Sequence, residues 1–294
     1  METAVRGTKR AMRLNMFIFR NGLWLGVLAG VLAVGGCKKE APGAGGGGTS
    51  AVSSGGKGGR IAATKAQPYV NSLGMKFVPV TGTKVLVSIW ETRVQDYLVF
   101  AEAMKAADVA KSGLEQRALY PASNVNWEEA SAFCRWLTEK ERKEGKLGAK
   151  DRYRLPMDKE WDAAVGTDPF PWGKKWPGEK DWPNLPGYKP STGDNTAPVG
   201  SYAANQFGIY DLGGNVAEWC EDWYQKLMND PSLRADDKKL EDDGGGRRYK
   251  VLRGASWIYW SPKSLATGRR HINLPGARSG LYGFRCVLEP GDGR

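Results

Sequence analysis

Histidine is almost absent from this sequence: there is one, His271, among 294 residues. An iron site of the two-histidine, one-carboxylate type needs two imidazoles, so this chain cannot supply one. His271 follows Arg269 and Arg270 and has no second imidazole to act with. We therefore expect His271 to be a surface or cleft residue without a catalytic role. A hydrolytic pair of Ser256 with His271 has only residue identity in its favour.

Long apolar runs are also missing. The run Leu23–Val34 has 12 residues, and crossing a bilayer takes about 20. Basic residues precede it, as in a cleaved export signal. It ends in Val-Gly-Gly-Cys37, which resembles the lipobox of bacterial lipoproteins, where the signal is cut before a cysteine that then carries the lipid. We interpret residues 1–36 as a lipoprotein signal peptide, with a chance cysteine after an ordinary signal as the alternative.

Residues 37–68 lack the apolar side chains that a core requires. They contain GAGGGGTS and SSGGKGGR, and such a composition behaves as a flexible tether. The formal net charge of the whole chain is +11. This surplus favours anionic lipid headgroups or cell-wall polymers, or simply a solvated surface. Export makes a nucleic-acid partner implausible.

Cysteine is scarce, with four residues in the chain. If Cys37 is lipidated, Cys134, Cys220 and Cys286 remain, which is an odd number. One pair plus one spare thiol is the simplest arrangement for an oxidising compartment.

Helical periodicity is confined to a few segments of residues 69–290. A capping box, TRVQ, begins at Thr92, and a second one begins at Asn126 and precedes an apolar stripe that includes Cys134. A third, short helix is expected from Pro156 to Gly166. The chain has 12 tryptophans and 39 glycines, which suits a loop-rich domain held together by large aromatic side chains.

Seven blocks occur in order along this region: NSLGMKFVPV, NVNWEEASAFCRWLTEKE, YRLPMDKEWDAAVG, FPWG, TAPVGSYAANQFGIYDLGGNVAEWCEDWY, LRGASW and GFRCV. Block for block they resemble the formylglycine-generating enzyme, or sulfatase-modifying factor, domain family. The resemblance covers residues 69–290 and implies an α+β fold, a modified C-type-lectin-like fold with little regular secondary structure.

The resemblance also locates the copper site of the family's oxidases. Their two copper-binding cysteines correspond here to Tyr259 and Ser264, the third and eighth positions after Ser256. Neither side chain offers the thiolate that Cu(I) prefers. We therefore expect neither copper nor iron in this protein.

What remains of that segment is aromatic and basic. In the family fold it lies along the substrate cleft, so we expect Ser256, Trp257, Tyr259, Trp260, Arg269 and Arg270 to bind a ligand. The rings would stack on a sugar or hold a peptide, and the arginines would meet an anionic group. The alternative is inward packing of Trp257 and Trp260, since strand alternation leaves at most one face outward.

Family members bind calcium through the turn that matches GIYDLGGNVAEW. The resemblance assigns the side chain of Asp211 and the carbonyls of Leu212, Gly214 and Val216 as ligands, the oxygen donors that Ca²⁺ prefers. A turn held only by hydrogen bonds from Asn215 and Glu218 is the alternative. A second family site, near Asn184, matches poorly and is not expected.

The resemblance further implies a disulfide between Cys134 and Cys286, with Cys220 as the spare thiol. Taken together, we expect a lipid-anchored protein of the bacterial cell envelope that faces the periplasm or exterior. Its domain would be a calcium-stabilised binding or scaffold module for a glycan or peptide. The alternative is a formylglycine-type oxidase with a different ligand set, or another oxidoreductase of this family.

The first prediction concerns the N-terminus. If the lipobox reading is right, the mature protein starts at Cys37 and carries acyl chains there. Intact-mass measurement of protein purified from membranes should show them, and Cys37→Ser should release the protein from the membrane fraction. A non-acylated mature N-terminus would contradict this reading.

Overall fold

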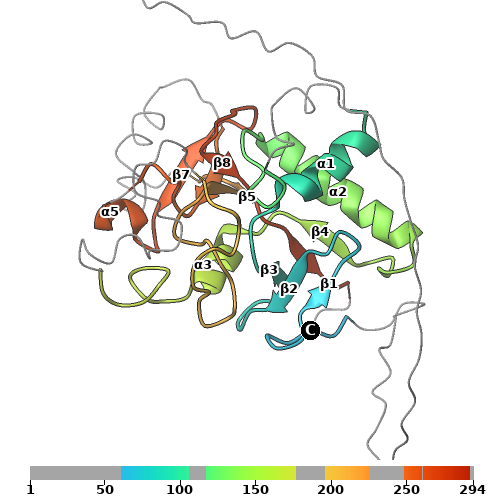
Figure 1. The fold of residues 1–294 in the computed structure, drawn as a ribbon, viewed down its shortest axis with the longest axis horizontal. Helices are drawn as coiled ribbons and strands as arrows, with labels where there is room; N and C mark the ends of the chain where they lie inside the picture. The colour runs from blue at the N-terminus through green and yellow to red at the C-terminus, as the bar shows by residue number, and fades with distance from the viewer. Residues whose placement is uncertain (1–60, 106–116, 177–195, 226–247, 260, 292–294) are drawn as a thin grey trace, which may run out of the picture. The chain divides into compact units, whose positions relative to one another are not determined.

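Short strands and a few helices, joined by long irregular segments, build the folded part of the chain (Figure 1). This computed structural model describes residues 61–105, 117–176, 196–225, 248–259 and 261–291. The helices are α1 (Val94–Ala103), α2 (Trp127–Lys143), α3 (Asp158–Val165) and α5 (Pro262–Leu265). The strands are β1 (Tyr69–Val70), β2 (Lys76–Pro79), β3 (Leu86–Ser88), β4 (Arg152–Arg154), β5 (Ala217–Trp223), β6 (Lys250–Arg253), β7 (Arg270–Asn273), β8 (Tyr282–Gly283) and β9 (Val287–Glu289).

The first sheet joins the beginning and the end of the domain. Its order is β1-β2-β3-β9-β4, and every neighbouring pair is antiparallel. The last strand, β9, lies between β3 and β4, so that Leu288 is opposite both Leu86 and Tyr153. The two ends of the domain therefore stabilise each other.

This sheet is buried on both faces, which explains its apolar strands. Successive residues point to opposite sides of a strand: Phe77 and Leu288 pack with α1 and α2, whereas Val78 and Val287 pack in a second core cluster with Trp161 of α3. Helices α1 and α2 and helix α3 accordingly cover opposite faces of the sheet (Figure 1).

The second sheet has the order β7-β6-β5-β8, with β5 and β8 parallel and the other pairs antiparallel. Trp219 of β5 and Leu252 of β6 are fully buried and belong to the same core cluster as Phe77. One core thus connects the two sheets, and β5 and β6 carry the segments on either side of the candidate site.

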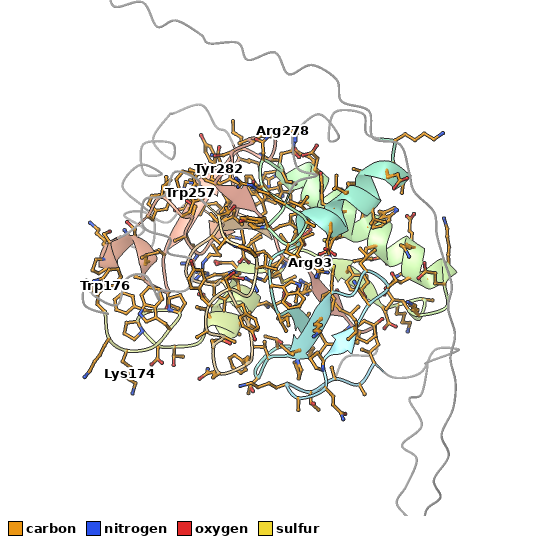
Figure 2. All side chains as sticks on the ribbon, in the orientation of Figure 1. Arg93, Lys174, Trp176, Trp257, Arg278 and Tyr282 are labelled. Carbon is orange, nitrogen blue, oxygen red and sulfur yellow. The ribbon has the colours of Figure 1, made fainter. Side chains whose placement is uncertain are left out.

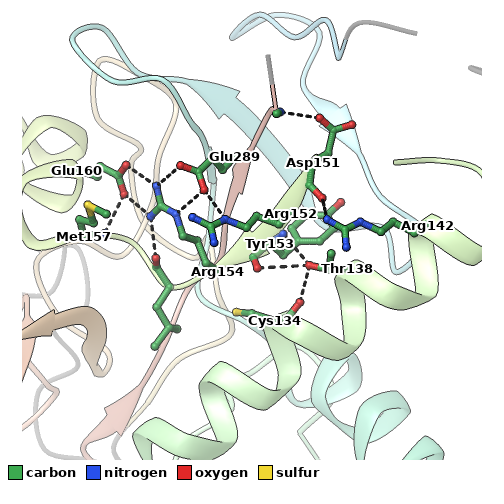
Figure 3. A network of polar contacts seen from close by, with 12 residues as sticks. Cys134, Thr138, Arg142, Asp151, Arg152, Tyr153, Arg154, Met157, Glu160 and Glu289 are labelled. Atoms are coloured by element: carbon green, nitrogen blue, oxygen red, sulfur yellow. Dashed lines mark hydrogen bonds and ion pairs between the residues drawn. The ribbon is translucent and has the colours of Figure 1, made fainter. Parts of the chain in front are cut away.

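Polar side chains fix β4 between its neighbours (Figure 3). Arg154 donates to both carboxylate oxygens of Glu160 at 2.7 Å and to Glu289 of β9. On the other side, the hydroxyl of Thr138 in α2 accepts from the Tyr153 amide at 2.8 Å and donates to the Cys134 carbonyl. Bidentate carboxylate–guanidinium pairs impose a definite geometry, so β4 holds α2, α3 and β9 in register.

Two of the expected helix starts need correction. Helix α2 begins after Asn126, as predicted, and the Asn126 side chain accepts from the Glu129 amide. Helix α1 instead has Arg93 as its N-cap, because Asp96 accepts from the Arg93 amide and pairs with its guanidinium. Helix α3 starts at Asp158, so Pro156 lies before the helix rather than in its first turn.

The three described cysteines are buried thiols. Cys134 lies on the buried face of α2, as predicted, and its sulfur is 3.5 Å from that of Cys286. A disulfide requires about 2.05 Å, so the structure brings the predicted partners together without the bond. Burial raises the pKa of Cys134 and of Cys220. The cross-link stays a prediction.

Nothing among the described helices is both long and apolar enough to cross a membrane. The mixture of short strands, few helices and long loops agrees with the α+β class expected from the sequence.

Close packing at Gly283 yields a prediction. A Cβ at this position would lie 2.7 Å from Val216 Cγ2 and 2.8 Å from the Ala122 carbonyl oxygen. Gly283→Ala should therefore lower the free energy of unfolding by about 1–3 kcal/mol through overpacking. Gly280→Ala is the matched control, because nothing lies within 4 Å of its Cβ position. Urea unfolding compares the two, and equal midpoints would contradict the packing described here.

Candidate functional site

The turn between residues 208 and 216 has an unusual backbone. Asp211 and Asn215 both adopt positive φ, 63° and 64°, a conformation that costs free energy for residues other than glycine. Asn and Asp tolerate it best among such residues. Both side chains are almost fully buried, so the surrounding contacts hold the turn in this form.

Asn215 connects three segments. Its amide nitrogen donates to Glu91 at 2.7 Å, its side-chain oxygen accepts from the Ala197 amide at 2.9 Å, and its backbone carbonyl accepts from the Trp257 amide at 3.0 Å. The hydrogen bonds from Asn215 that the alternative to a calcium site requires are therefore present. The structure adds that Asn215 positions the start of the predicted ligand-binding segment.

A buried ion pair lies beneath the turn. The guanidinium of Arg285 donates to both oxygens of Glu218 at 2.6 Å, and neither side chain is more than 1 % exposed. Arg285 also donates to the carbonyls of Ser88 and Tyr210, and the Trp161 indole donates to Glu218. Every polar group of the pair has a partner, as burial requires.

Two further carboxyl groups share this environment. Glu91 is fully buried and accepts from Asn215 and from the Val216 amide, and burial, followed by the charges of Asp211 and Glu218, raises its pKa well above the usual range. Burial also raises the pKa of Asp211 to about 6. The positive charge of Arg285 lowers the pKa of both groups, and this one guanidinium faces three carboxyl groups among the described residues, which leaves the site with an excess of carboxyl groups.

The predicted calcium ligands fit a hard cation in their chemistry. One oxygen of Asp211 accepts from the Gly200 amide at 2.7 Å, and the other is buried with no hydrogen-bond partner. In the described residues, no hydrogen bond reaches the carbonyls of Leu212, Gly214 or Val216. Calcium needs such oxygens, and its charge would offset the excess of carboxylate. No group of three or more Asp, Glu, His or Cys side chains is placed to hold a metal in the described ranges, so carbonyl oxygens would have to supply most of the ligands.

The aromatic segment forms a turn rather than a strand. Strand β6 ends at Arg253, and the Tyr259 amide donates to the Ser256 carbonyl at 3.0 Å. Strand alternation therefore does not decide where the rings point. Trp257 and Tyr259 are half-buried, and Ile258 between them is 38 % exposed. The Ser256 hydroxyl is buried without a partner, and Trp260 lies outside the described residues.

Of the two predicted arginines, Arg270 pairs with aspartates of α3. Arg270, on β7, donates to Asp158 at 2.6 Å and lies 3.6 Å from a carboxylate oxygen of Asp162. Arg269 is half-buried, and its carbonyl accepts from Arg253. The fully buried Arg253 pairs with the same two aspartates and lies over the Trp161 ring, 4.6 Å from its centroid. Internal carboxylates thus already neutralise Arg270.

His271 lies in β7 and is 8 % exposed, so it is buried rather than at the surface or in a cleft as expected. Its Nε2 is 2.9 Å from the Tyr282 hydroxyl, which also accepts from Asn273. His271 is buried because it lies opposite Leu252 of β6 and beside Tyr282, contacts that its sequence neighbours do not reveal.

The positions of the family's copper ligands carry no sulfur. Ser264 lies in α5, where its amide donates to the Ser261 carbonyl at 3.0 Å, and Tyr259 ends the aromatic turn. Cys134, Cys220 and Cys286 are buried in other parts of the described structure. Cu(I) therefore lacks its thiolate pair at this place, and the residues do not fit it.

A second group of aromatic side chains packs against the turn between residues 208 and 216. The rings of Phe170 and Trp172 stack with centroids 5.3 Å apart, and Trp176 packs against both. The Trp172 ring lies so close to Gly213 that a Cβ there would be 2.9 Å away. In Figure 2, Trp176 and Trp257 lie at the same end of the molecule as α5. The FPWG block contains Phe170 and Trp172, but its position in the sequence gave no sign that these rings approach the turn at Gly213.

Sequence similarity to known proteins identifies the family of this domain. The family described as "Sulfatase-modifying factor enzyme 1-like domain" matches residues 46–290. This chain belongs to that family. Within the sulfatase-modifying factor family, it is 31 % identical over 197 residues to the formylglycine-generating enzyme of Streptomyces coelicolor, covering 61 % of this chain and 56 % of the relative. It is 30 % identical, over 61 % of this chain and 54 % of the relative, to the inactive C-alpha-formylglycine-generating enzyme 2 of Bos taurus.

A further relative is the serine/threonine-protein kinase Pkn1 of Chlamydia trachomatis, 35 % identical over 58 % of this chain but 25 % of the relative. The chain thus spans between a quarter and just over half of these relatives. Among solved structures, the Treponema denticola variable protein 1 matches 76 % of this chain and 98 % of its own, with a TM-score of 0.55 and 22 % identity. The modified C-type-lectin-like α+β fold expected of a sulfatase-modifying factor domain is confirmed. The poorly matching second calcium position, near Asn184, lies outside the described residues.

Asp211 provides a test of the calcium expectation. Its pKa is raised in the folded state, so without metal its contribution to stability is largest below pH about 4 and is lost as the pH rises through about 6. Bound calcium favours the ionised form, stabilises the fold and removes this loss. Calorimetry in calcium and in chelator, at pH 5 and 7.5, measures both effects.

The variant Asp211→Asn keeps an acceptor for the Gly200 amide but loses the charge. It should abolish the calcium-dependent rise in melting temperature and be no less stable than the wild type in chelator. Glu128→Gln, at an exposed position of α2, is the control and should respond to calcium as the wild type does. If chelator leaves the wild-type melting temperature unchanged, the turn is held by hydrogen bonds alone.

Proposed function

We propose that this protein is a non-oxidising binding or scaffold module of the sulfatase-modifying factor family, and that the turn Ser256–Tyr259 is its recognition surface for an envelope glycan or peptide. The observation that carries the proposal is that the half-buried Trp257 and Tyr259 lie on a turn. The resemblance aligns this segment with the copper site of the family's oxidases. Large rings on a rigid turn present apolar surface at low entropic cost.

The rigidity of the turn supports recognition. Asn215 holds the Trp257 amide, and Asn215 is itself fixed by the buried Glu91. Asn215 belongs to the turn between residues 208 and 216, and Trp172 packs on Gly213 of that turn. A surface supported in this way loses little conformational freedom on binding.

The chemistry of the site argues against copper-dependent oxidation. Tyr259 and Ser264 supply no thiolate, and burial raises the pKa of the Cys134 and Cys220 thiols, which opposes metal binding there. The likeness to a relative named as inactive points the same way. The likeness to the Streptomyces coelicolor enzyme keeps oxidation as the alternative that the experiment must address.

The proposal includes a calcium ion at the Asp211 turn, where it would offset the carboxylate excess and so stabilise the support beneath the aromatic surface. It also includes a lipid at Cys37, which would tether the domain to a bacterial membrane so that it faces the periplasm or exterior. The Gly/Ser-rich composition of residues 37–68 suits such a tether.

Two substitutions test the recognition surface. Trp257→Ala and Tyr259→Ala should each weaken retention of the mature protein on peptidoglycan, envelope polysaccharide or peptide columns. A lost ring contact of about 0.5–1.5 kcal/mol corresponds to roughly a 2- to 10-fold weaker affinity. Val99→Ala removes a similarly exposed apolar side chain on α1 and should change nothing.

The same preparations test the alternative. Wild-type protein incubated with copper, oxygen and a cysteine-containing sulfatase peptide should form no formylglycine, as measured by peptide mass. Copper-dependent oxidation would overturn the proposal. Retention that is equal for all variants would remove the recognition role from this turn.

A further inference from the structure

A small pocket lies away from the aromatic turn, where the start of α3 meets the end of β5 and the middle of the second sheet. Its volume is about 300 Å³, at the lower end of the range for ligand sites. Its walls include Asp158, Asp222, Trp223, Gln225 and Arg270. No role for this pocket follows from the proposed function, which concerns the turn at Ser256–Tyr259.

The aromatic wall is held firmly. Trp223 ends β5 and is 39 % exposed. The ammonium of Lys250 lies 4.0 Å from the centroid of its ring and 3.8 Å from that of Trp127, and the guanidinium of Arg248 lies 4.4 Å from the Trp223 ring. These cation–π contacts fix the indole. Its N–H has no partner in the described residues, so the indole can donate a hydrogen bond to a ligand.

The remaining walls supply both acceptors and donors. Asp222 uses one carboxylate oxygen to accept from the Asp158 amide at 2.7 Å, and its other oxygen has no partner among the described residues. The Gln225 side chain is exposed and makes no hydrogen bond within the same residues. Arg270 uses Nε and one Nη on Asp158 and Asp162, and this leaves its other Nη for a ligand.

The charges of the pocket nearly cancel. Asp158 pairs with both Arg270 and Arg253, so the arginine that faces the pocket is already neutralised. The free carboxylate oxygen of Asp222 repels an anion, and the ammonium of Lys250 and the guanidinium of Arg248, both over the Trp223 ring, repel a cation. A ligand must therefore be neutral, and it must offer hydroxyl groups to both donors and acceptors, because unpaired buried polar groups cost free energy.

From these features we propose that the pocket binds one ring of a neutral saccharide. Sugar hydroxyls donate and accept at once, which suits Asp222, Gln225, Arg270 and the Trp223 N–H together. The apolar edge of a sugar ring suits the exposed part of the indole. The site is distinct in its residues from the aromatic turn, so the two can be tested separately.

The test is a titration of the mature protein with glucose, galactose and N-acetylglucosamine, followed by saturation-transfer NMR and tryptophan fluorescence. At least one should bind saturably, whereas glucuronate and glucosamine should bind about 10-fold more weakly or not at all. Gln225→Ala and Trp223→Phe should each weaken binding by about 3- to 10-fold, because each removes hydrogen-bonding groups and leaves the backbone contacts in place.

Lys174→Ala, at an exposed position between Phe170 and Trp176, is the control and should leave the affinity unchanged. No saturable binding of any neutral sugar would overturn this proposal, as would a preference for the charged sugars or equal affinity in Gln225→Ala and Trp223→Phe. The column retention of Trp257→Ala tests the proposed recognition turn, whereas the sugar titrations of Gln225→Ala and Trp223→Phe test this pocket.

Discussion

The buried ion pair between Arg285 and Glu218 organises this domain, because both charges have been removed from water and each needs every available partner. Arg285 donates to Ser88 at the end of β3 in the first sheet, to Glu218 in the second sheet and to the carbonyl of Tyr210 within the turn. Breaking such a pair by removing one partner typically costs about 3–5 kcal/mol. The two sheets and the turn can therefore satisfy these charges only in one relative position.

The same ion pair explains the electrostatics of the turn. One buried guanidinium faces the carboxyl groups of Glu91, Asp211 and Glu218, and the pKa values of Glu91 and Asp211 rise as a result of burial and mutual repulsion. A cation or a proton relieves this excess. Because Asn215 connects Glu91 to the Trp257 amide, the electrostatic state of the network is coupled to the support of the aromatic turn.

The domain also illustrates how a family scaffold is kept while its site changes. The buried network consists of Glu91, Asp211, Asn215, Glu218 and Arg285. It includes neither Tyr259 nor Ser264, the positions that the resemblance assigns to copper, so thiols at those positions would add soft ligands without replacing a member of the network. Fold and chemistry are thus separable here, and the surface left behind consists of rings supported by a turn that the core holds in place.

The sequence by itself determined the family, the α+β class and the core position of Cys134, because ordered blocks and helical periodicity are local properties. It also indicated correctly that the helix after Asn126 starts with a capping box. The sequence did not reveal that Glu91 and Arg285 lie near Asp211. It also did not reveal that Arg270 forms ion pairs with Asp158 and Asp162. The isolated arginines within LRGASW and GFRCV were the only sign of buried charge. Those outcomes depend on contacts between residues as much as 197 positions apart, and only the packing of the two sheets decides which charges are desolvated together and which partners they find.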